Sequence, residues 1–224
     1  MSAEQIPTFS AAEFHRASGV GDWRVTGAGP QAVFAAESLS HAAELLEPAI
    51  SAAERFGVRP DFDVRPEAVV VKVPYRDEQG IPATTAHFAA AVSEAAARLG
   101  FTPEPSRVQS VGIYVAQHSQ VDVRPFFTAA LGYEPLGDTD AVDPLRGGPQ
   151  LAFNPITGDT ASRGRTHFDV FVPADQAQAR VDAALAAGGR LVDDSHAPAW
   201  WTLASPDNHG VDIASWTDTH LMMP

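Results

Sequence analysis

Residues 165–173 read Arg-Thr-His-Phe-Asp-Val-Phe-Val-Pro, and this stretch decides how the second half of the chain is organised. The alternation from residue 166 to residue 172 predicts a β-strand with His167, Asp169 and Phe171 on one face. An imidazole and a carboxylate among apolar side chains are typical of a wall that holds a polar small molecule. A solvated strand face gives the same pattern, so the surrounding sequence has to separate the two interpretations.

The composition limits the size and the partners of the protein. Of the 224 residues, 45% are hydrophobic, which suffices for one large domain or two domains of about 100 residues each. The net charge is −13, from 15 Lys and Arg against 28 Asp and Glu. Nucleic acid and anionic membranes attract basic patches, so neither is expected as a partner.

The chain contains no cysteine, which excludes disulfides, a thiolate nucleophile and a thiolate metal site. Its first residues lack the basic and apolar segments of a signal peptide. No apolar run approaches the roughly 20 residues of a membrane span. These features together predict a cytoplasmic protein.

Acidic residues are used differently in the two halves of the chain. The first 105 residues hold ten Glu and four Asp, whereas the rest holds one Glu and thirteen Asp. The segment 101–106 contains two prolines after a glycine, which disfavours both helix and central strand. We therefore expect a linker there, with one domain over residues 1–102 and another over 107–224.

The first domain reads as strand, helix, strand, helix, and so as α+β. Residues 31–37 and 68–73 have strand patterns, the second rich in β-branched residues. Residues 39–53 have helical spacing, with a kink or break expected at Pro48. Thr84 or Thr85 is the expected cap of a last helix that ends at Gly100.

The second domain shows the element order βαβββ twice. The first unit is predicted from strand 110–116, helix 123–131 and three short strands at 134–138, 142–145 and 150–155. The second is predicted from strand 166–172, helix 174–187 and strands at 190–194, 200–204 and 211–216. This internal repeat appears in the order of the elements and not in residue identity.

Six segments of this half share a further likeness: Ser110-Val-Gly-Ile-Tyr-Val115, Phe127-Thr-Ala-Ala-Leu-Gly-Tyr133, Gly148-Pro-Gln-Leu-Ala-Phe-Asn-Pro155, Arg165-Thr-His-Phe-Asp169, Ala187-Gly-Gly189 and Ser205-Pro-Asp-Asn-His-Gly-Val-Asp212. With them, residues 108–216 resemble the vicinal oxygen chelate superfamily, which includes glyoxalase I, extradiol dioxygenases and bleomycin-resistance proteins. The resemblance implies that the two βαβββ units curl into an open cup that holds a ligand or a metal.

The resemblance also implies where metal ligands would stand. The four positions are Ser110, roughly Ala152, His167 and Asp212. Only His167 and Asp212 have side chains that commonly bind metals, whereas catalytic metal sites of this type use three or four protein ligands. We therefore expect a metal-free pocket and no cofactor.

His167 and Asp212 form the expected catalytic pair, since an imidazole beside a carboxylate can move a proton near neutral pH. A satisfied interior or rim histidine explains His167 equally well. Asp169, the second carboxylate of the strand, is also expected to contact the ligand. Further ligand contacts are expected from five aromatic residues: Tyr114, Phe153, Phe171, Trp200 and Trp201. Core packing is an alternative role for the aromatic residues. Trp200 and Trp201 are neighbours in a strand, so at most one can face the cup.

Five segments of the first domain share a likeness: Gly21-Asp-Trp23, the helix beginning at residue 39, Val58-Arg-Pro60, the strand 68–73 and the helix from Thr84. With them, residues 22–99 resemble a pterin carbinolamine dehydratase domain. That family uses a His-His-Pro motif and a third histidine as acid and base. The matching positions are Val58, Arg59 and Arg76, and none of these side chains can replace an imidazole. The resemblance therefore implies a fold without dehydratase activity. Arg59 and Arg76 could hold an anion, or they could be two solvated arginines.

Three functions remain open. The first is a cytoplasmic protein that binds a small organic molecule without a metal. The second is a lyase, isomerase or hydrolase that acts on a small oxygenated metabolite through His167 and Asp212, with or without a divalent metal. The third is an interaction module that dimerises through its first domain. Both resemblances imply self-association, so a homodimer is expected.

Overall fold

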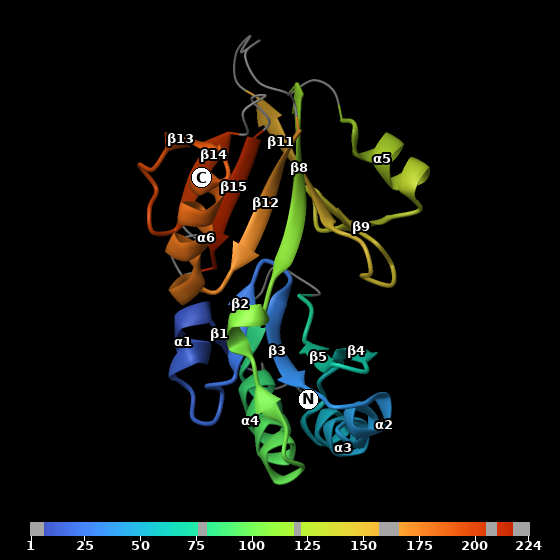
Figure 1. The fold of residues 1–224 in the computed structure, drawn as a ribbon. Helices are drawn as coiled ribbons and strands as arrows, with labels where there is room; N and C mark the ends of the chain where they lie inside the picture. The colour runs from blue at the N-terminus through green and yellow to red at the C-terminus, as the bar shows by residue number, and fades with distance from the viewer. Residues whose placement is uncertain (1–6, 76–79, 119–121, 157–165, 205–209, 217–224) are drawn as a thin grey trace. The chain divides into compact units, whose positions relative to one another are not determined.

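A computed structural model describes residues 7–75, 80–118, 122–156, 166–204 and 210–216. The chain divides into two compact units (Figure 1), an N-terminal one that ends at Val108 and a C-terminal one over Gln109–Trp216. Both units mix helices and strands.

The N-terminal unit is built on an antiparallel sheet in the order β2-β3-β5-β4, with β7 paired to the end of β3. A two-stranded pair, β1 with β6, stands apart from this sheet. The elements are β1 (Thr8–Phe9), α1 (Ala11–Arg16), β2 (Trp23–Thr26), β3 (Gly29–Ala35), α2 (Leu39–Glu44), α3 (Leu46–Phe56), β4 (Asp61–Arg65), β5 (Ala68–Lys72), β6 (Ile81–Pro82), α4 (Ala83–Arg98), β7 (Thr102–Pro103) and the 3₁₀ turn η1 (Pro105–Arg107).

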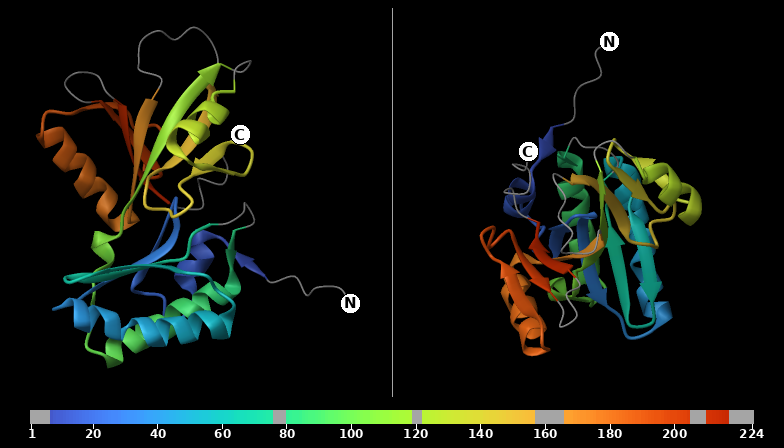
Figure 2. Two further views of the ribbon diagram at one scale, coloured as in Figure 1. Left: turned by 90° about the vertical axis from the view of Figure 1, so that its right-hand side faces the viewer. Right: turned by 90° about the horizontal axis from the view of Figure 1, so that it is seen from above.

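Trp23 on β2 ties the sheet of this unit to α4. Its side chain is fully buried, and its ring meets Phe88 edge-on. The indole Nε1 donates to the Ala89 carbonyl at 3.1 Å and to Ser93 Oγ at 3.2 Å, so the polar atom of this large buried side chain is satisfied. Helices α3 and α4 pack side by side against the sheet (Figure 2).

Two local expectations for the helices are corrected. The segment 39–53 breaks at Leu45, the C-cap of α2, and not at Pro48. Pro48 lies in the first turn of α3, where a missing N–H costs no helical hydrogen bond. Helix α4 starts after Pro82, with Thr85 buried inside it, so neither threonine is the cap. None of the described helices has both the length and the apolarity to cross a membrane.

The segment 101–106, expected as a linker, packs on the N-terminal unit. Phe101 is buried, and β7 pairs with β3 through Thr102 and Pro103. Val108 belongs to a small apolar cluster with Val33 and Ala68. Prolines are tolerated in so short an edge strand, which is why the composition of this segment was misleading.

The C-terminal unit contains the βαβββ order twice, within one eight-stranded sheet. The first repeat consists of β8 (Ser110–His118), α5 (Arg124–Leu131), β9 (Glu134–Leu136), β10 (Asp140–Val142) and β11 (Gln150–Ile156). The second consists of β12 (Thr166–Val172), α6 (Ala174–Ala186), β13 (Arg190–Asp193), β14 (Trp200–Ala204) and β15 (Gly210–Ser215). The strand order is β13-β14-β15-β12-β8-β11-β10-β9, so the repeats meet at the antiparallel pair of β12 and β8.

The alternation of side chains gives this sheet two different faces. On the first, here called the helix face, Val172, Trp201 and Ile213 pack with α6, while Val115, Leu151 and Phe153 pack with Phe127 of α5. The other face, turned away from these helices, is called the inner face. The register places His167, Asp169 and Phe171 on the inner face, as their alternation predicted.

Candidate functional site

Three side chains that could bind a ligand converge on the inner face from two neighbouring strands. His167 and Asp169 come from β12, and Asp212 lies directly opposite Asp169 on β15. The Nε2 atom of His167 is 3.2 Å from Asp169 Oδ1 and 3.8 Å from Asp212 Oδ2. The parallel register is therefore what brings the distant Asp212 to the two residues of β12.

The three side chains of this group are partly buried, and one of their acceptor atoms lacks a well-oriented hydrogen bond. The side chain of His167 is 38% exposed, that of Asp169 13% and that of Asp212 18%. Asp169 Oδ1 is buried and accepts no well-oriented hydrogen bond within the described part of the chain, because the His167 Nε2 atom at 3.2 Å makes an ion-pair contact only. Ser110 Oγ, on the same face, is also buried and has no hydrogen-bond partner in that part of the chain. A buried polar atom without a partner is unfavourable by about 1–3 kcal/mol, so a donor from a ligand would be stabilised at Asp169.

Tyr114 of β8 lies opposite His167, and the two rings are tilted at 30° with centroids 5.3 Å apart. Burial raises the pKa of the Tyr114 phenol, and the negative charges of Asp169, Asp140 and Asp212 raise it further. The phenol therefore stays protonated at neutral pH and can act as a hydrogen-bond donor among three carboxylates.

Asp140 of β10 and Gln150 of β11 belong to the same face, although neither residue was selected in the sequence analysis. Asp140 accepts from Gln150 Nε2 at 2.6 Å and from Thr139 Oγ1 at 2.9 Å. Burial raises the pKa of Asp140 in spite of these hydrogen bonds and of nearby Arg124.

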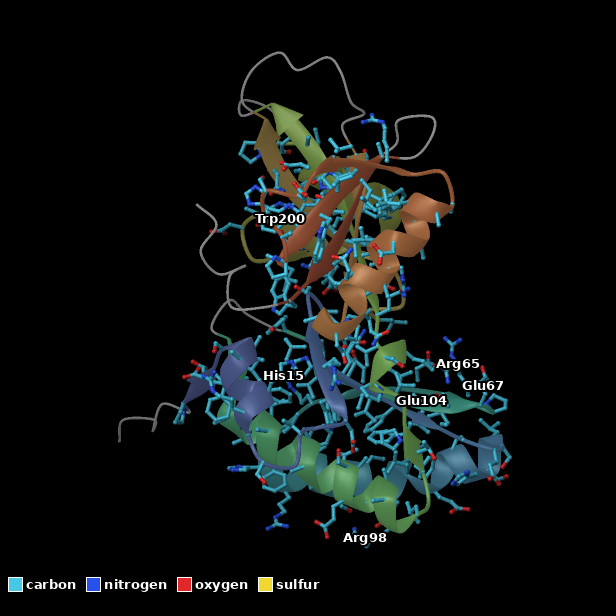
Figure 3. The ribbon with its side chains drawn as sticks, turned by 60° about the vertical axis from the view of Figure 1, so that its left-hand side comes forward. His15, Arg65, Glu67, Arg98, Glu104 and Trp200 are labelled. Carbon is cyan, nitrogen blue, oxygen red and sulfur yellow. The ribbon has the colours of Figure 1, made fainter. Side chains whose placement is uncertain are left out.

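Aromatic side chains border the polar group at one end of the inner face. Phe171 is buried and meets the Trp216 ring edge-on. Trp200, labelled in Figure 3, is half-buried and stacks on His196 with ring centroids 4.0 Å apart. Trp200 shares its face with Ala214 and Phe171, since the register pairs β14 with β15 and β15 with β12.

Phe153 and Trp201, two expected ligand contacts, lie on the opposite face. Phe153 packs with Val115 and Leu151 beneath α5, and Trp201 packs with Val181 of α6. Core packing is therefore the structural role of both residues. The adjacent pair Trp200 and Trp201 is divided between the two faces as strand geometry requires.

The register also corrects the expected positions of metal ligands on β8. Ser110 lies opposite Phe171, whereas Gly112 lies opposite Asp169 and Tyr114 opposite His167. Asp169 was not among the four positions expected to bind a metal, but it is the third residue of this group whose side chain could bind one. One atom each from His167, Asp169 and Asp212 lies within 4.8 Å of the others, a grouping that could hold a metal ion.

The expected anion pair in the N-terminal unit is only half visible. Arg59 is exposed and follows the C-terminus of α3, which Gly57 ends in a left-handed conformation. Arg76 lies outside the described residues. The pairing of Arg59 with Arg76 stays a prediction.

The C-terminal unit thus joins two βαβββ units in one sheet, the element order that the sequence predicted. Residues 112–214 match the family described as a glyoxalase-like domain, so this half of the chain carries a glyoxalase-like domain. Domains of this superfamily bind small molecules or act as enzymes.

Two solved structures illustrate what the chain is similar to. A glyoxalase/bleomycin resistance protein/dioxygenase superfamily member from Vibrio splendidus 12B01 is 14% identical, with 48% of this chain and 99% of that chain covered and a TM-score of 0.32. A structure described as an NAD-dependent benzaldehyde dehydrogenase from Legionella pneumophila is also 14% identical, with 49% and 100% covered and a TM-score of 0.36. None of the curated proteins compared with the chain matches it.

Proposed function

We propose that the C-terminal unit binds a small organic molecule on its inner face, through His167, Asp169 and Asp212. One observation carries this proposal: three ionisable side chains converge there, and the buried Asp169 Oδ1, although 3.2 Å from His167 Nε2, accepts no well-oriented hydrogen bond from the described residues. A ligand donor at this oxygen would remove an unfavourable desolvation. Tyr114, whose ring lies against that of His167, supplies a flat apolar surface and a phenolic donor.

We propose that this site works without a metal. At the register positions opposite the group, β8 and β11 present Gly112, Tyr114, Gln150 and Ala152, which are weak or unsuitable ligands for a divalent ion. If a divalent ion does bind, His167, Asp169 and Asp212 would hold it, and it would polarise an oxygen of the bound molecule. Elemental analysis of the purified full chain separates these states.

The second candidate function is a lyase, isomerase or hydrolase that acts on a small oxygenated metabolite. It is favoured by the contact of His167 with two carboxylates, which orient the imidazole. In this reaction class His167 would take a proton from the substrate, and Asp212 would orient the ring. Binding without turnover is the form we prefer, since it needs only the acceptor and the aromatic surface.

A thermal-shift screen of small organic metabolites against the full chain tests the proposed binding, with hits titrated by calorimetry in the presence of a chelator. His167→Ala and Asp212→Asn should each weaken binding at least tenfold, about 1.4 kcal/mol. His87→Ala is the matched control, since His87 is exposed and lies in the N-terminal unit. A screen without hits, or a hit that binds the His167→Ala variant with unchanged affinity, would contradict the proposal.

We further propose that the N-terminal unit keeps a pterin carbinolamine dehydratase-like fold without the activity. This rests on Val58 and Arg59 at the positions of the catalytic histidines. Full-length protein should not accelerate dehydration of a carbinolamine pterin, and measurable turnover would refute this part.

We also propose that the protein is a homodimer and that it is located in the cytoplasm. A monomer mass by light scattering across the micromolar range would remove the homodimer, and a tagged protein found outside the cytoplasm would remove the location.

A further inference from the structure

We propose that Asp140, held by Gln150 and Thr139, is a second polar anchor on the inner face, and that the ligand is a flat molecule with a cationic or hydrogen-bond-donating group at each end. This inference rests on the proposed function, because it places the second end of the same ligand. It concerns the first βαβββ repeat, whereas His167, Asp169 and Asp212 belong to the second.

The register gives the positions of the two anchors. Asp140 lies opposite Ala152, Ala152 opposite Tyr114, and Tyr114 opposite His167. Four adjacent strands thus carry one row of inner-face residues, with a carboxylate at one end and an imidazole at the other. Neighbouring strands are about 4.8 Å apart, so the backbones at the two ends of a flat row would be separated by roughly 14 Å.

The middle of the row is shaped for a flat body. Ala152 is small, and in the next row of the inner face Gly112, which lies opposite Gln150, has no side chain. A methyl group added at Gly112 would lie 3.4 Å from Tyr114 Cε2 and 3.7 Å from Phe171 Cε2. The two aromatic rings therefore border this small residue, and they leave a surface of ring edges and backbone between the anchors.

The side chain of Asp140 is fixed in place before any ligand arrives. Gln150 Nε2 donates to one carboxylate oxygen and Thr139 Oγ1 to the other. Each oxygen keeps a further lone pair, so a ligand N–H can be accepted without breaking either bond. A side chain held in this way loses little rotamer entropy on binding.

The charges of the face identify the chemical class of the ligand. The register puts Asp140 in the row of Tyr114, and Asp169 and Asp212 in the next row, so three carboxylates lie on the same face as the phenol. Carboxylates are acceptors only, and they favour ammonium, amidinium or amide donors over anions. Aromatic rings beside them attract the same cations. A planar molecule with a cationic group at each end fits both anchors.

The fluorescent diamidine 4′,6-diamidino-2-phenylindole is a suitable probe, with benzamidine as a one-ended reference. Both are titrated against the full chain at 0.15 M salt, where the Debye length of about 8 Å limits non-specific attraction by the net negative charge. The diamidine should bind at least tenfold more tightly than benzamidine. Asp140→Asn should remove most of that difference and leave the affinity for benzamidine within twofold, while Asp212→Asn weakens both.

Two variants serve as controls. Asp138→Asn makes the same charge change two residues away, at an exposed side chain, and should change neither affinity. Asp140→Glu keeps the charge but moves the carboxylate by one methylene, so it should weaken the diamidine less than Asp140→Asn does. Folding of each variant is checked by circular dichroism and melting temperature.

The outcomes separate the two proposals. Equal affinities for the diamidine and benzamidine, or a diamidine affinity that Asp140→Asn leaves unchanged, would overturn the second anchor while binding at His167 stands. The second anchor would also be overturned if neither probe binds while a metabolite from the screen binds in a way that depends on His167. An affinity that depends on added divalent metal would also overturn the inference, because a metal and not an organic cation would then neutralise the carboxylates.

Discussion

The two faces of the eight-stranded sheet are built from alternate residues of the same strands, yet they serve different purposes. On the helix face, Trp201, Ile213 and Val172 are packed against α6 and contain few polar atoms. One residue earlier on the same strands, Trp200 and Asp212 turn to the inner face. Packing therefore explains the first set completely, whereas the second set has polar groups that packing does not require.

If the inner face binds a ligand as proposed, one strand pattern carries both stability and binding. An apolar face gains free energy from burial, at about 25 cal/mol per Å². The inner face instead carries three carboxylates, and burial raises the pKa of one of them, Asp140. We therefore expect substitutions on the two faces to separate stability from binding.

The largest effect is expected from the tryptophan pair. Trp201→Ala should lower the free energy of unfolding by about 3–5 kcal/mol, because a large buried side chain leaves a cavity. Trp200→Ala removes a half-buried ring stacked on His196 and should cost less than about 1.5 kcal/mol. Urea unfolding of the full chain, followed by circular dichroism, measures both changes. Equal losses would show that the two faces do not differ in the way described.

Much of the C-terminal unit could be predicted from the sequence. The strand 166–172 and the strand 200–204 were placed correctly, because alternation and β-branched content identify strands locally. Gly132 ends α5 in a left-handed conformation, as a glycine after a helix predicts. The N-terminal unit was predicted less well from the sequence. Strands β2 and β4 were missed, because short strands with charged residues have weak periodicity.

The site was harder to predict because it depends on register. Local alternation put His167 and Asp169 on one face, but which residues of β8 lie opposite them is set by strand pairing between distant segments. Asp140 and Gln150 could not be selected from the sequence for the same reason. Phe153 and Trp201 look like binding residues by type, and only the positions of α5 and α6 show that they belong to the core.

A smaller effect is expected from Gly210, the inner-face residue beside His167. An added Cβ at Gly210 would lie 3.1 Å from His167 Cβ, closer than an ordinary contact. Gly210→Ala should therefore move His167 by a few tenths of an ångström and weaken ligand binding about threefold to tenfold, with little change in stability. Calorimetry with a hit from the metabolite screen measures this effect.

Gly21→Ala is the control for Gly210→Ala, because nothing lies within 4 Å of a Cβ added there. Binding should be unchanged in this variant. Unchanged binding in Gly210→Ala as well would mean that the position of His167 does not matter to the ligand.

The smallest effects, which nevertheless have opposite signs, are expected at two aspartates of the first repeat. Backbone N–H groups of Leu145, Gly148 and Gly147 lower the pKa of Asp143, so its charge favours the folded state. That stability is present above the ordinary aspartate pKa of about 3.9 and is lost as the pH falls. Burial raises the pKa of Asp140, so its charge disfavours folding above its folded pKa, and this cost disappears below about 3.9.

Neutral substitutions at these two aspartates should therefore shift the melting temperature in opposite directions at pH 7. Asp143→Asn should lower it and Asp140→Asn should raise it, and both differences should shrink at pH 3, which lies below the ordinary aspartate pKa of about 3.9. Thermal unfolding of the two variants at both pH values measures this. A shift in the same direction at pH 7 would contradict the comparison. Opposite shifts would show that the charge of Asp140 is retained at a cost to stability, which a cationic ligand on the inner face would offset.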